Sequence, residues 1–144
     1  MQTHGRVNYW LEIADNDLSA VESLIKGKNY LQAGFFCHLI VEKALKAAIE
    51  HNTGEIPPKI HKLKVLAKQS GIIDTLSEEQ LSLLDELDPL QLEARYPEYR
   101  AVIAKTLTKE KLQRIYEETR GFLCWIKQQL GKLPEDTPTK SEKS

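Results

Sequence analysis

Apolar side chains recur every three or four positions along most of the chain, which is the spacing of one face of an α-helix. Asn52-Thr-Gly54 and Gly71 mark two helix ends, and Pro89 ends or kinks a third helix. No segment alternates apolar and polar residues over a useful length, so no strand is expected. The pattern predicts five helices, at about Asn8–Lys26, Tyr30–Asn52, Ile60–Gln69, Ser77 to Pro89, and Thr108–Gly131.

The predicted architecture is all-α, an up-and-down helical bundle of four long helices plus one short helix. The second helix is apolar nearly all round and is expected at the centre, with a second copy of the chain covering what the other helices leave open. Ser77 and Gln80 form a capping-box pattern at the start of the fourth helix. Residues 91–106 are expected as an ordered loop, 1–131 as one domain, and 132–144 as a disordered tail.

Composition excludes several classes of protein. Twenty Lys and Arg against 21 Asp and Glu give a net charge of −1, which argues against general coating of nucleic acid. The most apolar stretch, residues 31–49, contains His38 and three charged residues and is too polar for a membrane span. The N-terminus lacks an apolar signal region, so a cytoplasmic protein is expected. Cys37 and Cys124 both lie among apolar residues and are expected as buried free thiols.

Four polar residues of the second and third helices could carry chemistry. Glu42 falls inside an apolar arc, where Lys46 four residues later is its natural partner. That pair is either a structural ion pair or part of a polar site with the 95–100 segment. His38 on the same arc is expected as a core residue with one hydrogen bond. His61 either caps the third helix or orients the connection before it, or it touches a ligand.

The segment Ala94-Arg-Tyr-Pro-Glu-Tyr-Arg100 is the most informative. Arg95 and Arg100 offer forked donors suited to phosphate, and Tyr96 and Tyr99 offer ring faces for stacking on a base. The alternative is a loop pinned to the bundle by aromatic packing and an Arg–carboxylate pair. No cluster of Cys or His, no glycine-rich phosphate loop and no nucleophile elbow is present in the sequence, so neither a metal nor a cofactor is expected.

Several separated pieces together resemble the HEPN family (higher eukaryotes and prokaryotes nucleotide-binding). These are Ala14-Asp-Asn-Asp-Leu18, Tyr30-Leu-Gln-Ala33, Val41-Glu-Lys-Ala-Leu-Lys-Ala47, Ile60-His-Lys-Leu63 and Ala94-Arg-Tyr-Pro97. The resemblance implies a helical homodimer that often acts with a minimal nucleotidyltransferase partner in a toxin–antitoxin-like system.

Many HEPN proteins are metal-independent RNases with an Arg-x4–6-His motif, and no Arg of this chain has a His at that spacing. The sequence is therefore similar to the branch without the nuclease His. The expected function is noncatalytic binding of a nucleotide or RNA, through residues drawn from three regions: Arg95, Tyr96, Tyr99, Arg100, Glu42, Lys43, Lys46 and His61. The alternatives are an atypical RNase in which His61 or Tyr96 replaces the missing His, and a purely structural dimer module.

Overall fold

A computed structural model describes residues 2–131, and all the regular structure in this range is helical. Three helices are long: α1 (Gln2–Lys26), α2 (Tyr30–Thr53) and α6 (Lys109–Gly131). Three are short: α3 (Leu63–Ser70), α4 (Glu78–Leu87) and α5 (Pro97–Ala104). Three 3₁₀ turns complete the described part: η1 (Ile73–Thr75), η2 (Asp88–Leu90) and η3 (Leu92–Ala94). The all-helical prediction is confirmed, but the division into four long helices and one short helix is wrong.

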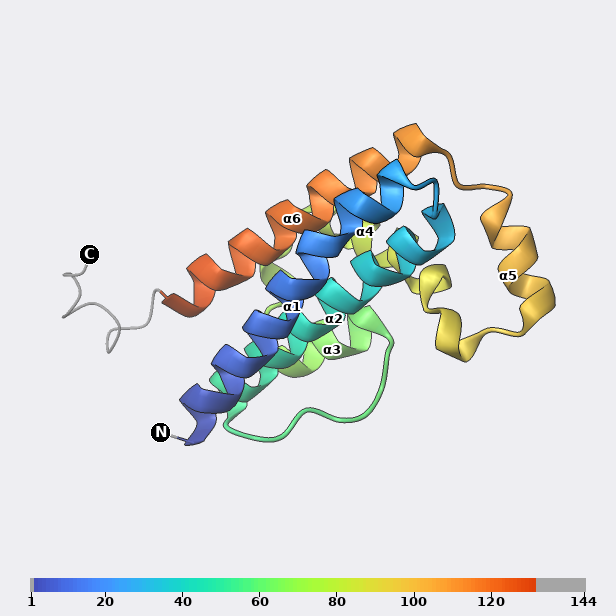
Figure 1. Cartoon of the computed structure of the whole chain (residues 1–144). Coiled ribbons are helices and arrows are strands. Elements are labelled where there is room, and N and C mark those ends of the chain that lie inside the picture. Colours follow the sequence, from blue (N-terminus) through green and yellow to red (C-terminus); the bar gives the residue numbers. More distant parts are fainter. Residues whose placement is uncertain (1, 132–144) are drawn as a thin grey trace.

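The centre of the bundle is α2, which packs along much of its length against α1 and on other sides against α6 and α3 (Figure 1). The α1–α2 turn is tight, with Lys28 in the left-handed region at φ 63°. Gly54 ends α2 in the same backbone region, where glycine carries no Cβ penalty. Within the described residues α2 exposes no large apolar side chain.

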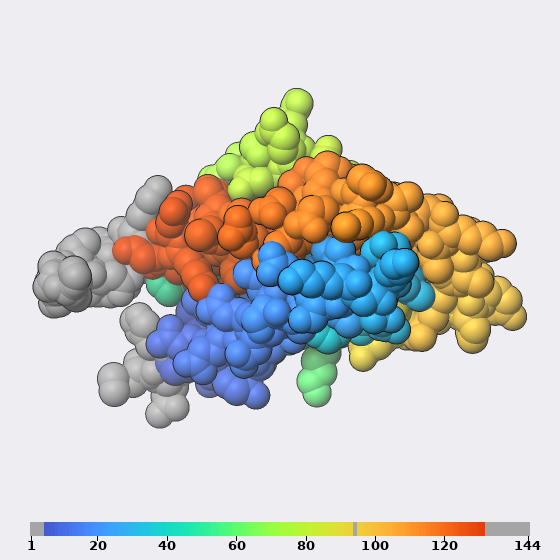
Figure 2. Space-filling view, turned by 45° about the horizontal axis from the view of Figure 1, so that its top comes forward, coloured from blue at the N-terminus to red at the C-terminus, as the bar shows by residue number. Residues whose placement is uncertain are grey.

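The shorter helices cover the remaining side of α2. Ser77 Oγ accepts the Gln80 N–H, and the Gln80 side chain accepts the Ser77 N–H, which confirms the predicted capping box of α4. By contrast, α5 contributes no buried residue to the core. It lies at the opposite end of the molecule from the start of α1, as the space-filling view also shows (Figures 1 and 2).

Three predicted boundaries are wrong, each for a local reason. α1 begins at Gln2 rather than Asn8, and in its extra turns Val7 is buried and Arg6 pairs with Glu50 of α2. α3 begins at Leu63 rather than Ile60, because the chain stays extended after the two prolines. The 91–106 segment is not simply a loop: Pro97 occupies the first position of α5, where its fixed φ favours a helix.

Cysteine burial was predicted correctly for only one of the two thiols. Cys37 is fully buried, and burial raises its pKa to about 12. Cys124 is exposed, because it lies on α6 between residues that face the core rather than on that face. The expected tail, 132–144, lies outside the described residues. No helix within 2–131 has the length and apolar character needed to cross a membrane.

Candidate anion-binding site

A stripe of polar residues runs along the buried side of α2. His38, Glu42, Lys46 and Glu50 are four positions apart, so they stack on one face of the helix, and all four are buried. Lys46 Nζ donates to Glu42 Oε2 at 2.9 Å, which confirms the predicted pair. The same ammonium lies 5.8 Å from the centre of the Trp10 ring of α1, in cation–π range.

The C-terminal end of this stripe, at Glu50, holds α1 against α2. The Trp10 indole N–H donates to Glu50 Oε1 at 2.6 Å, and the Arg6 guanidinium donates to the other carboxylate oxygen. Because Glu50 is fully buried, its charge needs both partners. This end of the stripe therefore has a structural role.

The N-terminal end of the stripe contacts His61 and so holds in place the connection between α2 and α3, residues 54–62. The Nδ1 atom of His61 donates to Glu42 Oε2 at 3.1 Å, and the His61 carbonyl accepts from His38 Nε2 at 3.2 Å. His38 is thus the buried core residue that was predicted. The contacts of His61 agree with its predicted role in orienting the connection.

Burial and neighbouring charges shift the pKa values of His38 and Glu42 in opposite directions. Burial lowers the pKa of His38 to about 4, and the nearby charge of Glu42 offsets only part of that effect. Burial alone raises the pKa of Glu42, but the hydrogen bond and charge of Lys46, with help from His61, outweigh it and leave the pKa below its usual range. Near neutral pH Glu42 is therefore ionised and His38 is neutral.

Beside His61, a cavity of about 240 Å³ opens between the connection and the η2–η3 turns. It is lined by His61, Lys62, Asp88, Gln91 and Arg95. We call this the Arg95 cavity. Its lining has two fixed cations and one carboxylate, together with an imidazole and an amide. The positive excess and the number of N–H groups suit an anion with several acceptor oxygens.

Two N–H groups of the lining residues are buried without an acceptor. Gln91 is 3% exposed, its Oε1 accepts the Glu93 N–H at 2.7 Å, and its Nε2 has no partner. Arg95 Nη2 donates to the Asp88 carbonyl at 3.1 Å, while Arg95 Nε has no partner. A buried donor without an acceptor costs about 1–3 kcal/mol, so these groups favour a ligand that brings oxygen atoms to them.

Tyr99 holds the Arg95 guanidinium from the other side. The guanidinium carbon lies 4.9 Å from the centre of the Tyr99 ring, in cation–π geometry. With this contact and the bond to the Asp88 carbonyl, the guanidinium is already positioned before any ligand arrives. Such preorganisation lowers the entropy cost of binding.

The other predicted site residues do not line the cavity. Tyr96 follows Arg95 directly and is 81% exposed. Arg100 donates through Nε and Nη2 to the Leu92 carbonyl at 3.2 and 2.7 Å, so it pins α5 to η3. Lys43 is half-buried, and its charge acts on Asp17 of α1. Glu42 and Lys46 lie behind His61 rather than in the cavity.

The predicted site residues did not include Lys62, Asp88 or Gln91. Lys62 follows His61, a predicted site residue, and Gln91 begins the 91–106 segment that was expected to bind a ligand. Both residues were therefore close to a predicted binding region. No role was predicted for Asp88, which precedes the helix-ending Pro89. Nothing local in the sequence shows that this turn folds back onto the start of α3, where Asp88 Oδ1 accepts the Leu63 N–H at 3.3 Å.

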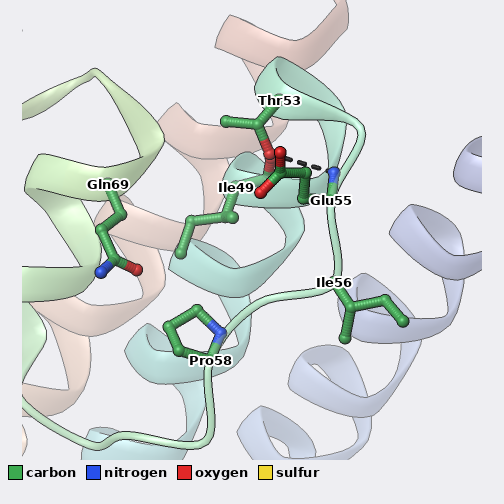
Figure 3. A pocket seen from close by; sticks show the side chains of 6 residues that line it. All are labelled: Ile49, Thr53, Glu55, Ile56, Pro58 and Gln69. Atoms are coloured by element: carbon green, nitrogen blue, oxygen red, sulfur yellow. Dashed lines mark hydrogen bonds between the residues drawn. The ribbon is translucent and has the colours of Figure 1, made fainter.

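A second cavity, of about 380 Å³, lies at the C-terminal end of α2 (Figure 3). The Ile49 side chain lies between Gln69 of α3 and the connection, which carries Pro58. The Glu55 N–H donates to Thr53 Oγ1 at 3.1 Å. No residue of its lining has a buried polar atom without a partner among the described side chains. Its lining has no cation and one carboxylate, so the Arg95 cavity is the stronger candidate for an anion. Within residues 2–131, no group of three or more His, Cys, Asp and Glu side chains could hold a metal ion.

The fold and the cavity together define a small helical-bundle protein with a preorganised, cation-rich pocket beside its central helix. A family model described as "HEPN domain" matches residues 7–129, which is most of the chain. The chain therefore belongs to the HEPN family. Neither a search of curated proteins nor one of solved structures gave a match.

Proposed function

We propose that this HEPN protein binds a nucleotide or RNA without cleaving it, and that the Arg95 cavity takes a phosphate of that ligand. The observation that carries the proposal is the pair of unsatisfied buried donors, Arg95 Nε and Gln91 Nε2, in a lining that also has Lys62. A phosphate oxygen would accept hydrogen bonds from these donors, whose burial without an acceptor is unfavourable. Membership of the HEPN family supports a function connected with nucleotides or RNA.

The exposed ring of Tyr96 supports binding of the base that is attached to the phosphate. At 81% exposure it is the most exposed large apolar side chain described, and it directly follows Arg95 in the chain. A base attached to the bound phosphate can stack on its face, and such stacking tolerates any base. Glu42 and Lys46 support the site indirectly by holding His61, and Arg100 supports it by holding α5.

The family resemblance extends the proposal to partners. We propose a homodimer that acts with a minimal nucleotidyltransferase in a toxin–antitoxin-like system. The absence of an Arg-x4–6-His motif in the sequence supports a noncatalytic role.

One observation favours a second candidate, a metal-independent RNase. His61 and Arg95 are distant in the sequence but line the same cavity, and Glu42 accepts from His61 Nδ1 at 3.1 Å. A carboxylate that fixes an imidazole in this way prepares the other ring nitrogen for proton transfer. In this candidate His61 would act as the general acid or base, and Arg95 would stabilise the phosphate.

Titration of the purified protein with a short oligoriboadenylate tests the leading proposal. Arg95→Met removes the charge-assisted contact but keeps much of the packing on Tyr99, and should weaken binding about ten- to a hundredfold. Arg120→Met is the matched control, because Arg120 pairs only with exposed Glu117 on α6, and it should bind like the wild type.

Equal affinity of the two variants, or no binding by the wild type, would contradict the proposal. The same oligonucleotide incubated without metal should remain intact. Cleavage that is lost in His61→Gln would favour the RNase instead.

A further inference from the structure

One member of the Arg95 cavity does not fit a pocket built for a bare anion. Asp88 contributes a carboxylate to a lining in which the other residues supply N–H donors. Its side chain is partly exposed at 36%, so it is not simply part of the core. A carboxylate beside a phosphate repels it, and this repulsion is strong where water is partly excluded.

A structural role accounts for only part of this carboxylate. Asp88 Oδ1 accepts the Leu63 N–H at 3.3 Å and so ties η2 to the first turn of α3. An asparagine oxygen could accept that bond equally well, because the donor is an uncharged amide. Neither the negative charge nor the second oxygen is needed for the tether.

The charges around Asp88 show what the carboxylate faces. Burial raises the pKa of Asp88, and the charge of Asp85 acts in the same direction, whereas the hydrogen bond from Leu63 and the charges of Lys62 and Arg95 lower it. Both cations that would hold a phosphate are therefore close enough to act on this carboxylate. The ligand that fits such a lining carries a hydroxyl or amino donor next to its phosphate, so that each group meets an opposite partner.

We propose that Asp88 accepts a hydrogen bond from the ribose 2′-hydroxyl of the bound nucleotide, so that the Arg95 cavity selects ribonucleotides over deoxyribonucleotides. The 2′-hydroxyl is the group by which proteins distinguish RNA from DNA, and in an oligoribonucleotide it stands on the carbon next to the one that carries the 3′-phosphate. This inference rests on the proposed function, since it concerns the same cavity. It adds the class of sugar and the residue that recognises it.

The test compares a short oligoriboadenylate with the oligodeoxyadenylate of the same length, using wild-type protein and Asp88→Asn. The wild type should bind the ribose form about tenfold tighter, as expected for one hydrogen bond to a charged group. In Asp88→Asn the preference should nearly vanish. The substitution should also tighten binding of the deoxy form, because it removes the repulsion of phosphate while the Leu63 tether remains.

Asp15→Asn is the matched control. Asp15 lies on α1, is exposed and pairs with Lys127 outside the cavity lining. It should keep the wild-type ratio of affinities. Circular dichroism of both variants checks that the helices persist.

The outcomes separate the two proposals. Equal binding of both oligonucleotides by the wild type, or an unchanged ratio in Asp88→Asn, overturns the role of Asp88 and leaves phosphate binding intact. Binding of neither oligonucleotide by the wild type overturns the proposed function and this inference together.

Discussion

Glu42 of the buried stripe on α2 accepts two hydrogen bonds, and its other oxygen lies 3.4 Å from His38 Nδ1. It accepts from Lys46 Nζ at 2.9 Å and from His61 Nδ1 at 3.1 Å through the same oxygen. Losing this carboxylate therefore affects both the stability of the bundle and the position of His61 beside the cavity. Stability and binding can be measured separately.

Glu42→Gln should destabilise the protein by about 1–3 kcal/mol, because it leaves a nearly buried Lys46 ammonium without its counter-ion. Denaturant unfolding measures this loss, and the double variant with Lys46→Met should recover part of it. Strict additivity of the two single changes would show that the residues do not interact. Glu117→Gln, which breaks an exposed pair on α6, should change stability by less than about 0.5 kcal/mol.

His38 predicts a defined dependence of stability on pH. Burial lowers its pKa from 6.5 to about 4, so the unfolded chain takes up a proton at a higher pH than the folded protein does. The contribution of His38 to stability is complete above pH 6.5 and is lost as the pH falls towards 4. Its full size is about 3 kcal/mol.

Urea unfolding between these two pH values measures the effect, with His38→Gln as the comparison. In the variant, the free energy of unfolding should change clearly less steeply with pH across this range. Equal slopes in both proteins would contradict a neutral, buried His38.

The residues of the site differ in how far the sequence revealed them. Glu42 and Lys46 were found because a helix fixes the distance between positions four apart. Arg95 was found because its side-chain chemistry suits phosphate. Asp88 and Gln91 were missed, because they reach His61 only when the η2–η3 turns pack beside α3 and α2, and no local pattern encodes that packing.

Among the elements, α5 is the least anchored to the bundle. It buries no residue, and its side-chain tether is the double hydrogen bond from Arg100 to the Leu92 carbonyl. Periodicity missed it for the same reason, since a short helix in which Ile103 only partly packs on the core shows no clear apolar stripe. The long helices were predicted because each buries a set of regularly spaced apolar residues.

Hydrogen exchange should therefore show α5 opening far more readily than α2. The amides of α5 should exchange at least about a hundredfold faster than those in the middle of α2, because few buried contacts oppose local unfolding. Arg100→Met should increase exchange in α5 alone, whereas Arg120→Met on α6 should leave it unchanged. Equal protection of α5 and α2 would contradict this account of the fold.

At the scale of the whole molecule, the proposed homodimer needs a surface other than α2. The described exposed apolar side chains include Val102 of α5, which is 59% exposed, and Val65 of α3, which is 38% exposed. Val102 is the better candidate, because it is the more exposed of the two.

Sedimentation equilibrium at micromolar concentration should give twice the chain mass of 16.5 kDa. Val102→Asp should shift the protein towards monomer, and the matched Val65→Asp should not. A wild-type monomer would contradict the dimer and leave the Arg95 cavity unaffected.

The central claim is that a phosphate of the ligand occupies the Arg95 cavity and satisfies its buried donors. The most direct measurement is an NMR titration that follows the side-chain N–H signals of Arg95 Nε and Gln91 Nε2 while a short oligoriboadenylate is added. We expect both signals to move downfield as they gain an acceptor, and the Arg120 Nε signal to stay in place. Binding of the oligonucleotide without a shift at Arg95 and Gln91 would contradict the account.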